Sequence, residues 1–262
     1  MAETHEIVLL DKKPGDAEIS AAVARHFEAE AAAYDALDAG SRKRSEYVDA
    51  VDRLVVAGLG SRAPLSSLLS IACGTGRREA SIRAALGRRF EIVGVDGSAS
   101  MCGLAETAGL ATIRSPWLDA DLGARRFDAA LYLHSFGLAP SRAQRVRELR
   151  KIAALLRPGA PLYLDVLNVA DRDEWGPEIS ALFAERRLDR RGYEPGDVFY
   201  RRIGGTTVSF FHYFGLEEIS GLLTEAGFLP TRPAFVGYGK RPGQLVGPEE
   251  GAIVMAATAG GG

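Results

Sequence analysis

Short apolar runs of strand length alternate with longer stretches in which apolar residues recur at helical spacing. The apolar runs predict strands, and they cover residues 67–72, 90–95, 110–114, 127–133 and 160–166. The helical spacing predicts helices over 77–87, from about Ser98, and over 141–156, where Arg157-Pro158-Gly159 ends the last one. Strands that alternate with helices in this way predict a doubly wound α/β fold. Its sheet should be mostly parallel, with the ligand site at the carboxyl ends of the strands.

The two ends of the chain add elements to this central pattern. Residues 17–38 and 44–58 predict two helices outside the sheet, with Asp16 as the N-cap of the first. Residues 169–205 are polar, rich in Arg, and interrupted by Gly and Pro, which predicts an insertion with one short helix near 177–188. Regular structure returns at 206–214 and in a helix over 216–226. Strands near 228–237 and 251–258 would close a seven-stranded sheet as an antiparallel pair.

We therefore divide the chain into four segments. They are an N-terminal helical lid (1–60), a ligand-binding core (61–168), an inserted substrate lid (169–205) and the C-terminal part of the same core (206–262).

The most informative local signal is a glycine turn followed by an acid. Residues 68–76 read Leu-Leu-Ser-Ile-Ala-Cys-Gly-Thr-Gly, and the next apolar run ends in Asp96. In a βαβ unit such glycines let the backbone approach a nucleotide-like ligand, and the acid accepts both ribose hydroxyls. A dinucleotide fingerprint that starts at Gly74 would need a third glycine where Glu79 stands. The pattern that binds a pyrophosphate is therefore missing.

Composition narrows the classes of function. With 262 residues, of which 47% are apolar and 25% charged, the chain can form one large domain or one domain with a small lid. The net charge of -2 argues against a nucleic-acid-binding surface. Cys73 and Cys102 show no C-x-x-C spacing, which argues against a disulfide framework or a zinc site and suits the reducing cytoplasm. No apolar run reaches the roughly 18 residues of a membrane span, and the first residues lack the layout of a signal peptide. We expect a cytoplasmic protein that binds a small molecule, and a homodimer is one open option.

Five motifs in order resemble class I S-adenosylmethionine-dependent methyltransferases that act on small molecules. They are ACGTG, GVDGSASM, FDAALYLHSFG, LLRPGAPLYLDVLN and FGLEEISGLLTEAGF. The segment YDALDAGSRKRSEYVDAV, together with SFG and DVLN, is most similar to the group of glycine and sarcosine N-methyltransferases. The resemblance implies a Rossmann-like fold, S-adenosylmethionine as cofactor, and methyl transfer to an N, O or C atom of a small metabolite.

The resemblance also implies a set of cofactor-binding residues at the glycine turn, the acidic loop, the later strand ends and the lid. They are Tyr34, Ala72, Cys73, Gly74, Thr75, Gly76, Asp96, Gly97, Ser98, Met101, Trp117 and Leu133. Tyr34 and Tyr47 could instead be plain packing residues of the N-terminal helices. Trp117 falls where the adenine is often held, with Asp119 or a backbone amide at the edge of the base.

Three departures from the family pattern affect the substrate and the site. Ser70 stands where the family usually has an acid. His134 and Leu167 replace an Asn and an Arg that help the subgroup to hold an amino acid carboxylate. Without the cation a buried carboxylate would stay unpaired, so we expect that glycine is not the substrate.

Two histidines are candidates for the chemistry. A sulfonium is already a good methyl donor, so the protein has mainly to align the acceptor, and some acceptors also need a base. His134, at the end of the fourth strand, is the first candidate for a base or substrate-orienting group, although it could simply cap the strand. His212 lies in Phe210-Phe-His-Tyr-Phe214 and could face the pocket or the opposite layer. Asp119 and Asp121 lack further ligands nearby, so we expect no metal.

Aromatic residues near the C-terminal half offer a second reading of the substrate. Phe199, Tyr200, Phe210, Phe211, Tyr213, Phe214, Phe235 and Tyr238 form either an apolar or aromatic substrate wall or the core of a hairpin. Two rival functions stay open at this point. One is a nicotinamide-dependent oxidoreductase, and the other is a methyltransferase-fold enzyme that catalyses a cyclisation or rearrangement.

Overall fold

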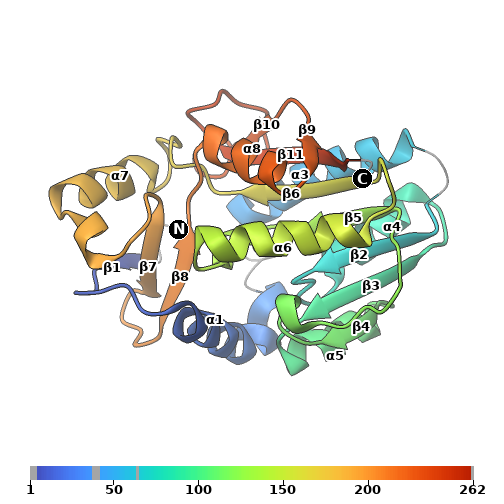
Figure 1. Cartoon of the computed structure of the whole chain (residues 1–262), viewed down its shortest axis with the longest axis horizontal. Helices are drawn as coiled ribbons and strands as arrows, with labels where there is room; N and C mark the ends of the chain where they lie inside the picture. Colours follow the sequence, from blue (N-terminus) through green and yellow to red (C-terminus); the bar gives the residue numbers. More distant parts are fainter. Residues whose placement is uncertain (1–4, 37–41, 63–64, 261–262) are drawn as a thin grey trace.

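A twisted central sheet with helices on both faces forms the body of the protein (Figure 1). The computed structural model describes residues 5–36, 42–62 and 65–260. The strands of this sheet, in spatial order, are β10 (Ala234–Val236), β11 (Ala252–Ala259), β6 (Pro161–Val166), β5 (Ala129–Tyr132), β2 (Ser67–Ile71), β3 (Glu91–Asp96) and β4 (Ala111–Arg114). Strands β2 to β6 run parallel, and β11 is antiparallel to β6. The predicted doubly wound, mostly parallel sheet with antiparallel C-terminal strands is confirmed.

The edge beside β11 differs in detail from the prediction. The strand predicted over 228–237 is two short strands, β9 (Phe228–Pro230) and β10, and both pair with β11. Pro233 lies between them and has no amide hydrogen to donate to a ladder, which accounts for the interruption. The two strands thus fill one position at the edge of the sheet.

Helices cover the two faces of the sheet in separate layers. They are α3 (Arg42–Gly60), α4 (Arg77–Leu86) and α5 (Ala99–Thr107) on one face, and α6 (Arg142–Leu155) and α8 (Leu216–Glu225) on the other. Successive residues of β2 serve opposite layers: Leu69 packs in the cluster of α6 and α8, whereas Leu68 packs in the cluster of α3. Both faces of the parallel strands are therefore buried, as their nearly continuous apolar sequence requires.

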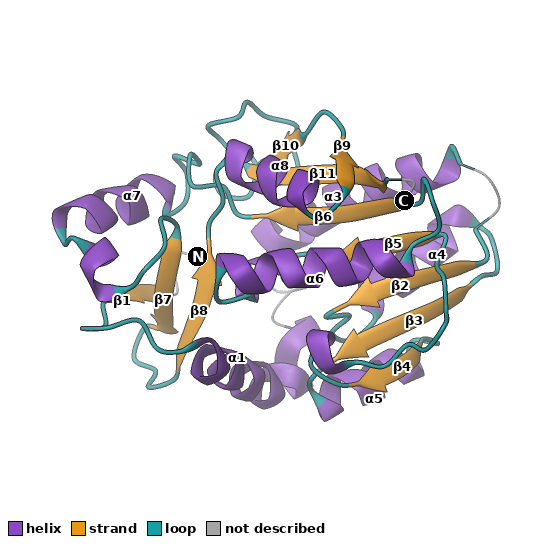
Figure 2. Cartoon of the chain, viewed as in Figure 1, coloured by secondary structure: helices purple, strands orange, loops and turns teal. Residues whose placement is uncertain are grey.

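A smaller antiparallel sheet stands beside the central one (Figure 2). Its order is β1 (His5–Val8), β7 (Asp197–Arg202) and β8 (Val208–His212). The segment predicted as an insertion supplies α7 (Gly176–Glu185), a 3-10 turn at Leu188–Arg191, and β7. β8, in the segment assigned to the core, pairs with β7 instead of with the central sheet. β1 was not expected, because four residues show little periodicity and their partner lies far along the chain.

Helix α1 (Asp16–Glu30) lies between the smaller sheet and α5 and continues into a 3-10 turn at Ala31–Ala33. Its N-cap is Gly15, so the expectation that Asp16 is the N-cap is wrong. Asp16 instead accepts a hydrogen bond from the Ser141 hydroxyl at the start of α6, at 2.5 Å. The last residues of the helix predicted over 17–38 lie outside the described residues. Among the described helices, none combines the length and the apolar character needed to cross a membrane.

Candidate active site

Two adjoining cavities lie at the carboxyl ends of the parallel strands. The larger, of about 450 Å³, extends from the tips of β2 and β3 to α1 and α6. The smaller, of about 60 Å³, lies between the glycine turn, the end of β5 and α3. Tyr34, Ala72, Gly74 and Ser135 line both cavities. The two spaces therefore meet at the glycine turn, where open α/β sheets bind their ligands.

The glycine turn and the acid of β3 are joined directly at the floor of the larger cavity. The Gly74 amide donates to Asp96 Oδ2 and the Ser98 amide donates to Oδ1, both at 2.9 Å. Burial raises the pKa of Asp96 above its usual value, although these amides favour the charged form. Each carboxylate oxygen can still accept a further hydrogen bond. At Gly74 the backbone is left-handed, and a Cβ would meet nothing within 4 Å, so the turn faces open space.

The larger cavity is acidic. Among the described residues that line it, Asp96 and Glu148 are the carboxylates, and no Lys, Arg or His is present. Such a surface suits a ligand that is cationic or rich in hydrogen-bond donors. It is unsuited to a pyrophosphate, which proteins hold with cations and backbone amides.

The end of the larger cavity near α6 is formed by Trp117 and a buried acid. The Trp117 indole donates to the Glu148 carbonyl at 3.3 Å, and Lys151 Nζ lies 4.6 Å from the centre of its ring. The Glu148 carboxylate accepts hydrogen bonds from Gln144 Nε2 and from the Tyr132 hydroxyl, each at 2.9 Å. Burial raises the pKa of Glu148 to about 6.

Helix α1 covers the larger cavity and is tied down at its far end. Val23 and Phe27 of α1 line the cavity. The hydroxyls of Ser98 and Ser100 each donate to the Glu28 carboxylate at 2.6 Å, and these hydrogen bonds lower the pKa of Glu28. Since Ser98 also holds Asp96, the covering helix is connected to the acid at the floor of the cavity.

His134 lines the smaller cavity, and its backbone and ring are held by one buried acid. Its φ of 58° is left-handed, which is uncommon outside glycine. The His134 amide donates to Asp165 Oδ1 at 2.9 Å, and the ring Nδ1 lies 3.5 Å from Oδ2. The Tyr47 hydroxyl donates to the same Oδ2 at 2.5 Å, and Tyr238 stacks on the imidazole with ring centres 6.0 Å apart.

Asp165 is ionised within this group despite being fully buried. Burial opposes its charge, but the hydrogen bond from His134 and the positive charge of Arg78 outweigh it and hold the pKa of Asp165 below its usual value. Arg78 is itself fixed by Asp52, with Nη2 at 2.7 Å from the carboxylate. The imidazole of His134 is therefore oriented by a permanent negative charge.

A further buried acid, Glu79 of α4, lies beside the end of β2. Ser70, which replaces the acid usual in the family, donates its hydroxyl to Glu79 Oε1 at 2.6 Å. The carboxylate in this position thus comes from α4 and not from β2. Asp35, Arg77, Arg78 and Glu79 give the smaller cavity side chains of both charges.

Most of the predicted cofactor residues gather at the two cavities. Besides the shared Tyr34, Ala72 and Gly74, the predicted residues at the smaller cavity are Cys73, Thr75, Leu133 and His134. Those at the larger cavity are Asp96, Gly97, Ser98, Met101 and Trp117, whereas Asp119 lines neither cavity. Gly76 also lines neither. Its Cβ would lie 3.0 Å from the Ala105 Cα, so this glycine allows α5 to pack closely.

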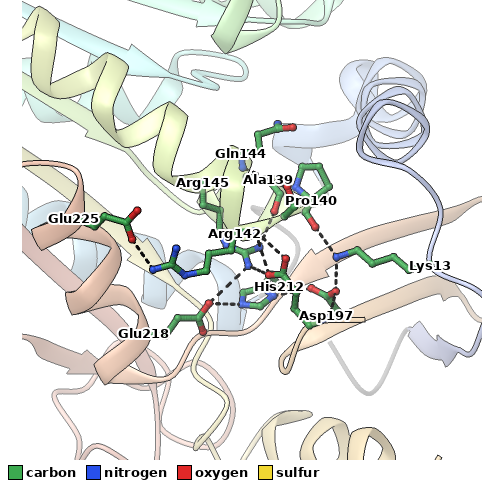
Figure 3. Close-up of polar contacts among 12 residues, drawn as sticks. Lys13, Ala139, Pro140, Arg142, Gln144, Arg145, Asp197, His212, Glu218 and Glu225 are labelled. Atoms are coloured by element: carbon green, nitrogen blue, oxygen red, sulfur yellow. Dashed lines mark hydrogen bonds and ion pairs between the residues drawn. The ribbon is translucent and has the colours of Figure 1, made fainter. Parts of the chain in front are cut away.

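His212 lies away from both cavities, in a buried cluster of charged residues (Figure 3). Its Nδ1 is 2.8 Å from Asp197 Oδ1 and its Nε2 is 3.0 Å from Glu218 Oε1. An imidazolium can donate to both at once. Lys13 contacts Asp197 at 2.6 Å, and hydrogen bonds from His212 and Lys13 lower the pKa of Asp197 even though burial opposes this.

The same cluster includes Arg145, whose guanidinium is fully buried and contacts Glu194. Glu194, Asp197 and His212 approach one another closely enough to hold a metal ion. Lys13 and Arg145, however, already supply positive charge to these acids. The cluster joins the N-terminal segment, β7, β8, α6 and α8. His212 thus links several elements of the fold and lines neither cavity.

The aromatic residues expected to form a substrate wall are mostly core. Of that set only Tyr238 lines either of the two cavities. Tyr200, Phe211 and Tyr213 pack with Trp175 between the smaller sheet and α7, and Phe199 and Phe210 pack with Ile19 of α1. Phe214 joins the central core, and Phe235 packs against it. The structure thus favours the hairpin-core interpretation.

The sequence analysis did not single out Asp165 or Glu148, which the structure places beside His134 and in the larger cavity. Asp165 did leave a signal, because an acid within the run Pro161–Val166 must be buried on a parallel strand. Glu148 left none, since an acid is ordinary on the polar side of a helix.

Comparison with known proteins identifies the fold. No protein-family model matches the sequence, and a search of curated protein sequences finds no match. Among solved structures, a 1,6-didemethyltoxoflavin N1-methyltransferase from Burkholderia thailandensis, with bound 1,6-didemethyltoxoflavin and S-adenosylhomocysteine, is 19% identical. It has a TM-score of 0.65 and covers 98% of this chain and 95% of its own. A SAM-dependent methyltransferase from Methanosarcina mazei is 20% identical, with a TM-score of 0.63 over 78% of this chain and 97% of its own.

The N-methyltransferase NodS from Bradyrhizobium japonicum, in complex with S-adenosylhomocysteine, is 15% identical. Its TM-score is 0.59, over 90% of this chain and 98% of its own. At these identities the likeness establishes the fold: the chain has the fold of class I S-adenosylmethionine-dependent methyltransferases.

Proposed function

We propose that this protein is an S-adenosylmethionine-dependent methyltransferase that acts on an N, O or C atom of a small molecule. The observation that carries the proposal is the acidic larger cavity at the glycine turn, lined in its described part by two carboxylates and no cation. A sulfonium nucleoside brings positive charge and hydroxyl and amino donors, which this surface complements. A dinucleotide brings a pyrophosphate, which it would repel.

Different residues at the two cavities would bind different parts of this ligand. Asp96, held by the Gly74 and Ser98 amides, accepts the ribose hydroxyls. Arg77 and Glu79 of the smaller cavity suit the zwitterionic amino acid tail. When bound, S-adenosylmethionine supplies an activated methyl group, so the protein has mainly to align the acceptor and exclude water.

His134 is the base in this proposal. With Nδ1 directed to Asp165, its Nε2 has no hydrogen-bond partner among the described residues and can take a proton from the acceptor as the new bond to carbon forms. The carbon–sulfur bond breaks at the same time, and its electron pair stays on sulfur. Asp165 and Tyr47 are positioning residues, because Asp165 holds the backbone and ring of His134 and the Tyr47 hydroxyl holds Asp165.

The polar lining of the smaller cavity supports a nitrogen or oxygen acceptor. Side chains of both charges, together with His134, surround a small space. Several similar structures are N-methyltransferases, among them the toxoflavin enzyme and NodS. We expect the acceptor atom to be the nitrogen of an amine or the oxygen of a hydroxyl on a small metabolite.

Binding titrations test the cofactor. The protein should bind S-adenosylhomocysteine and not NAD. Asp96→Ala should weaken that binding by about 1–3 kcal/mol, because hydrogen bonds to a charged group are lost. Asp119→Ala is the matched control, since Asp119 lines neither cavity, and it should bind like the parent. Binding of NAD alone, or unchanged affinity in Asp96→Ala, would remove the proposed cofactor site.

Product mass tests the reaction. Purified protein is incubated with S-adenosylmethionine and a panel of small amines, phenols and alcohols, and the products are analysed by mass spectrometry. Methyl transfer adds one methyl group to the acceptor. A product of unchanged mass would show a cyclisation or rearrangement instead.

We also propose that the protein works in the cytoplasm and that α1 with its following turn acts as a lid. Cys73 and Cys102 are buried thiols, which is the state expected in a reducing compartment. The lid role is supported by the position of α1 over the larger cavity.

A further inference from the structure

We propose that Glu148, together with Gln144, binds the exocyclic amino group of the cofactor's adenine from α6. This role rests on the methyltransferase function proposed above. It assigns the recognition of the base to a helix, in a chain whose loop after β4 offers no acid to the cavity.

The position of the base follows from the two ends of the larger cavity. At one end Tyr34 and Ser135 are shared with the smaller cavity, where His134 lies. The reacting end of the ligand must reach this junction. With the ribose on Asp96, the base then occupies the opposite end, which Trp117 and Glu148 line.

The base needs an acceptor at that end. The exocyclic amino group of adenine is a donor, and a carboxylate is a stronger acceptor for it than the hydroxyl of Ser115, which also lines the cavity. Glu148 and Asp96 are the carboxylates among the described lining residues, and Asp96 is used by the ribose. Glu148 is therefore the acid available to the base.

The Glu148 carboxylate has capacity for such a ligand. Each of its oxygens accepts one hydrogen bond, from Gln144 or from Tyr132, and a carboxylate offers about four acceptor positions. Glu148 is buried, with only 4% of its surface exposed, and yet it forms no ion pair with any described residue. Both of its hydrogen-bond donors are neutral, and the positive charges of Arg145 and Arg147 act on it only from beyond ion-pair distance. A further donor from a ligand would therefore stabilise this buried charge. Gln144 donates through Nε2, which leaves its carbonyl oxygen as a second acceptor.

The test measures discrimination between two ligands. Wild type, Glu148→Gln and Asp96→Asn are titrated with S-adenosylhomocysteine and with its analogue in which hydrogen replaces the 6-amino group. Wild type should prefer the amino form by about tenfold or more, the value of one hydrogen bond to a charged group. Glu148→Gln should reduce this preference to less than about threefold. Asp96→Asn, the control, should weaken both ligands and leave the ratio of their dissociation constants unchanged.

The ratio of two dissociation constants is insensitive to a general loss of folded protein, and urea unfolding of each variant checks that loss separately. Equal binding of both ligands by wild type, or an undiminished preference in Glu148→Gln, would overturn the role of Glu148 alone. Wild type that binds neither ligand would overturn the proposed function as well.

Discussion

His134 and His212 occupy two regions that look alike in sequence and differ in what their surroundings allow. Both rings lie beside buried acids. His134 has one, Asp165 at 3.5 Å from Nδ1, and its side chain is 22% exposed at the smaller cavity. His212 has an acid at each ring nitrogen and is fully buried.

The difference concerns the second ring nitrogen. Proton transfer needs a nitrogen that can meet a substrate, and His134 has one that no described residue engages. His212 has none, since Asp197 and Glu218 take both. A histidine is a candidate base when one ring nitrogen is held by an acid and the other has no protein hydrogen-bond partner, so that it can meet a substrate.

Replacing His134 should produce the largest effect on turnover. In His134→Asn we expect kcat to fall by about 10²–10⁴, the value of a general base. The unfolding free energy should change by less than about 1 kcal/mol, because Asn tolerates the left-handed backbone. Methyl-transfer assays and urea unfolding measure the two quantities. His26→Asn on α1 is the control, and a kcat and pH profile equal to the parent's in His134→Asn would leave His134 structural.

Replacing His212 should show the opposite pattern. His212→Ala breaks a buried charged cluster, so we expect a loss of about 3 kcal/mol in unfolding free energy. Turnover by the folded protein should be retained. Arg142→Ala on α6 is the matched control, because the ion pair of Arg142 with Glu225 is largely exposed and should be worth less than about 1 kcal/mol. Lost turnover with unchanged stability in His212→Ala would reverse the comparison.

Glu148 adds a buried acid whose two hydrogen-bond donors are neutral, while Arg145 and Arg147 act on it only from beyond ion-pair distance. Its folded pKa of about 6 exceeds the ordinary 4.5, so its stabilising contribution is full below 4.5 and is lost as the pH rises through 6. When the pH is lowered from about 7.5 to about 4, the unfolding free energy of wild type should therefore rise by about 2 kcal/mol relative to that of Glu148→Gln. Urea unfolding of both proteins across this range measures the change. A constant difference would contradict the burial of this charge.

Replacing Tyr47 should have the smallest effect on stability and turnover. Burial raises its pKa well above the usual value, so it remains a hydrogen-bond donor to Asp165. Tyr47→Phe should lower the unfolding free energy by about 1 kcal/mol and reduce kcat severalfold. A loss of turnover as large as that of His134→Asn would place the Tyr47 hydroxyl itself in the proton transfer.

The parts of the molecule that could be predicted are those whose signals are local. Gly74 and Asp96 belong to one βαβ unit, and their contact follows from that unit. The smaller sheet could not be predicted, because β1 pairs with β7 across most of the chain, with His5 opposite Arg202.

The same reason explains why the sequence could not distinguish the residues at the cavities from those that lie elsewhere. The two histidines differ through partners that come from other elements, such as Asp165 on β6 and Asp197 on β7. Gly76 was expected at the ligand because glycine patterns do not tell a turn that meets a ligand from one that meets a helix. In the structure Gly76 lines neither cavity, and a Cβ added there would lie 3.0 Å from the Ala105 Cα.

Ser98 connects the roof and the floor of the larger cavity, since its hydroxyl donates to Glu28 and its amide donates to Asp96. Where ligand binding at Asp96 and docking of α1 are coupled through Ser98, thermodynamic reciprocity requires each to favour the other by the same factor. Affinity and residence time would then depend on Glu28, a side chain that lines neither cavity.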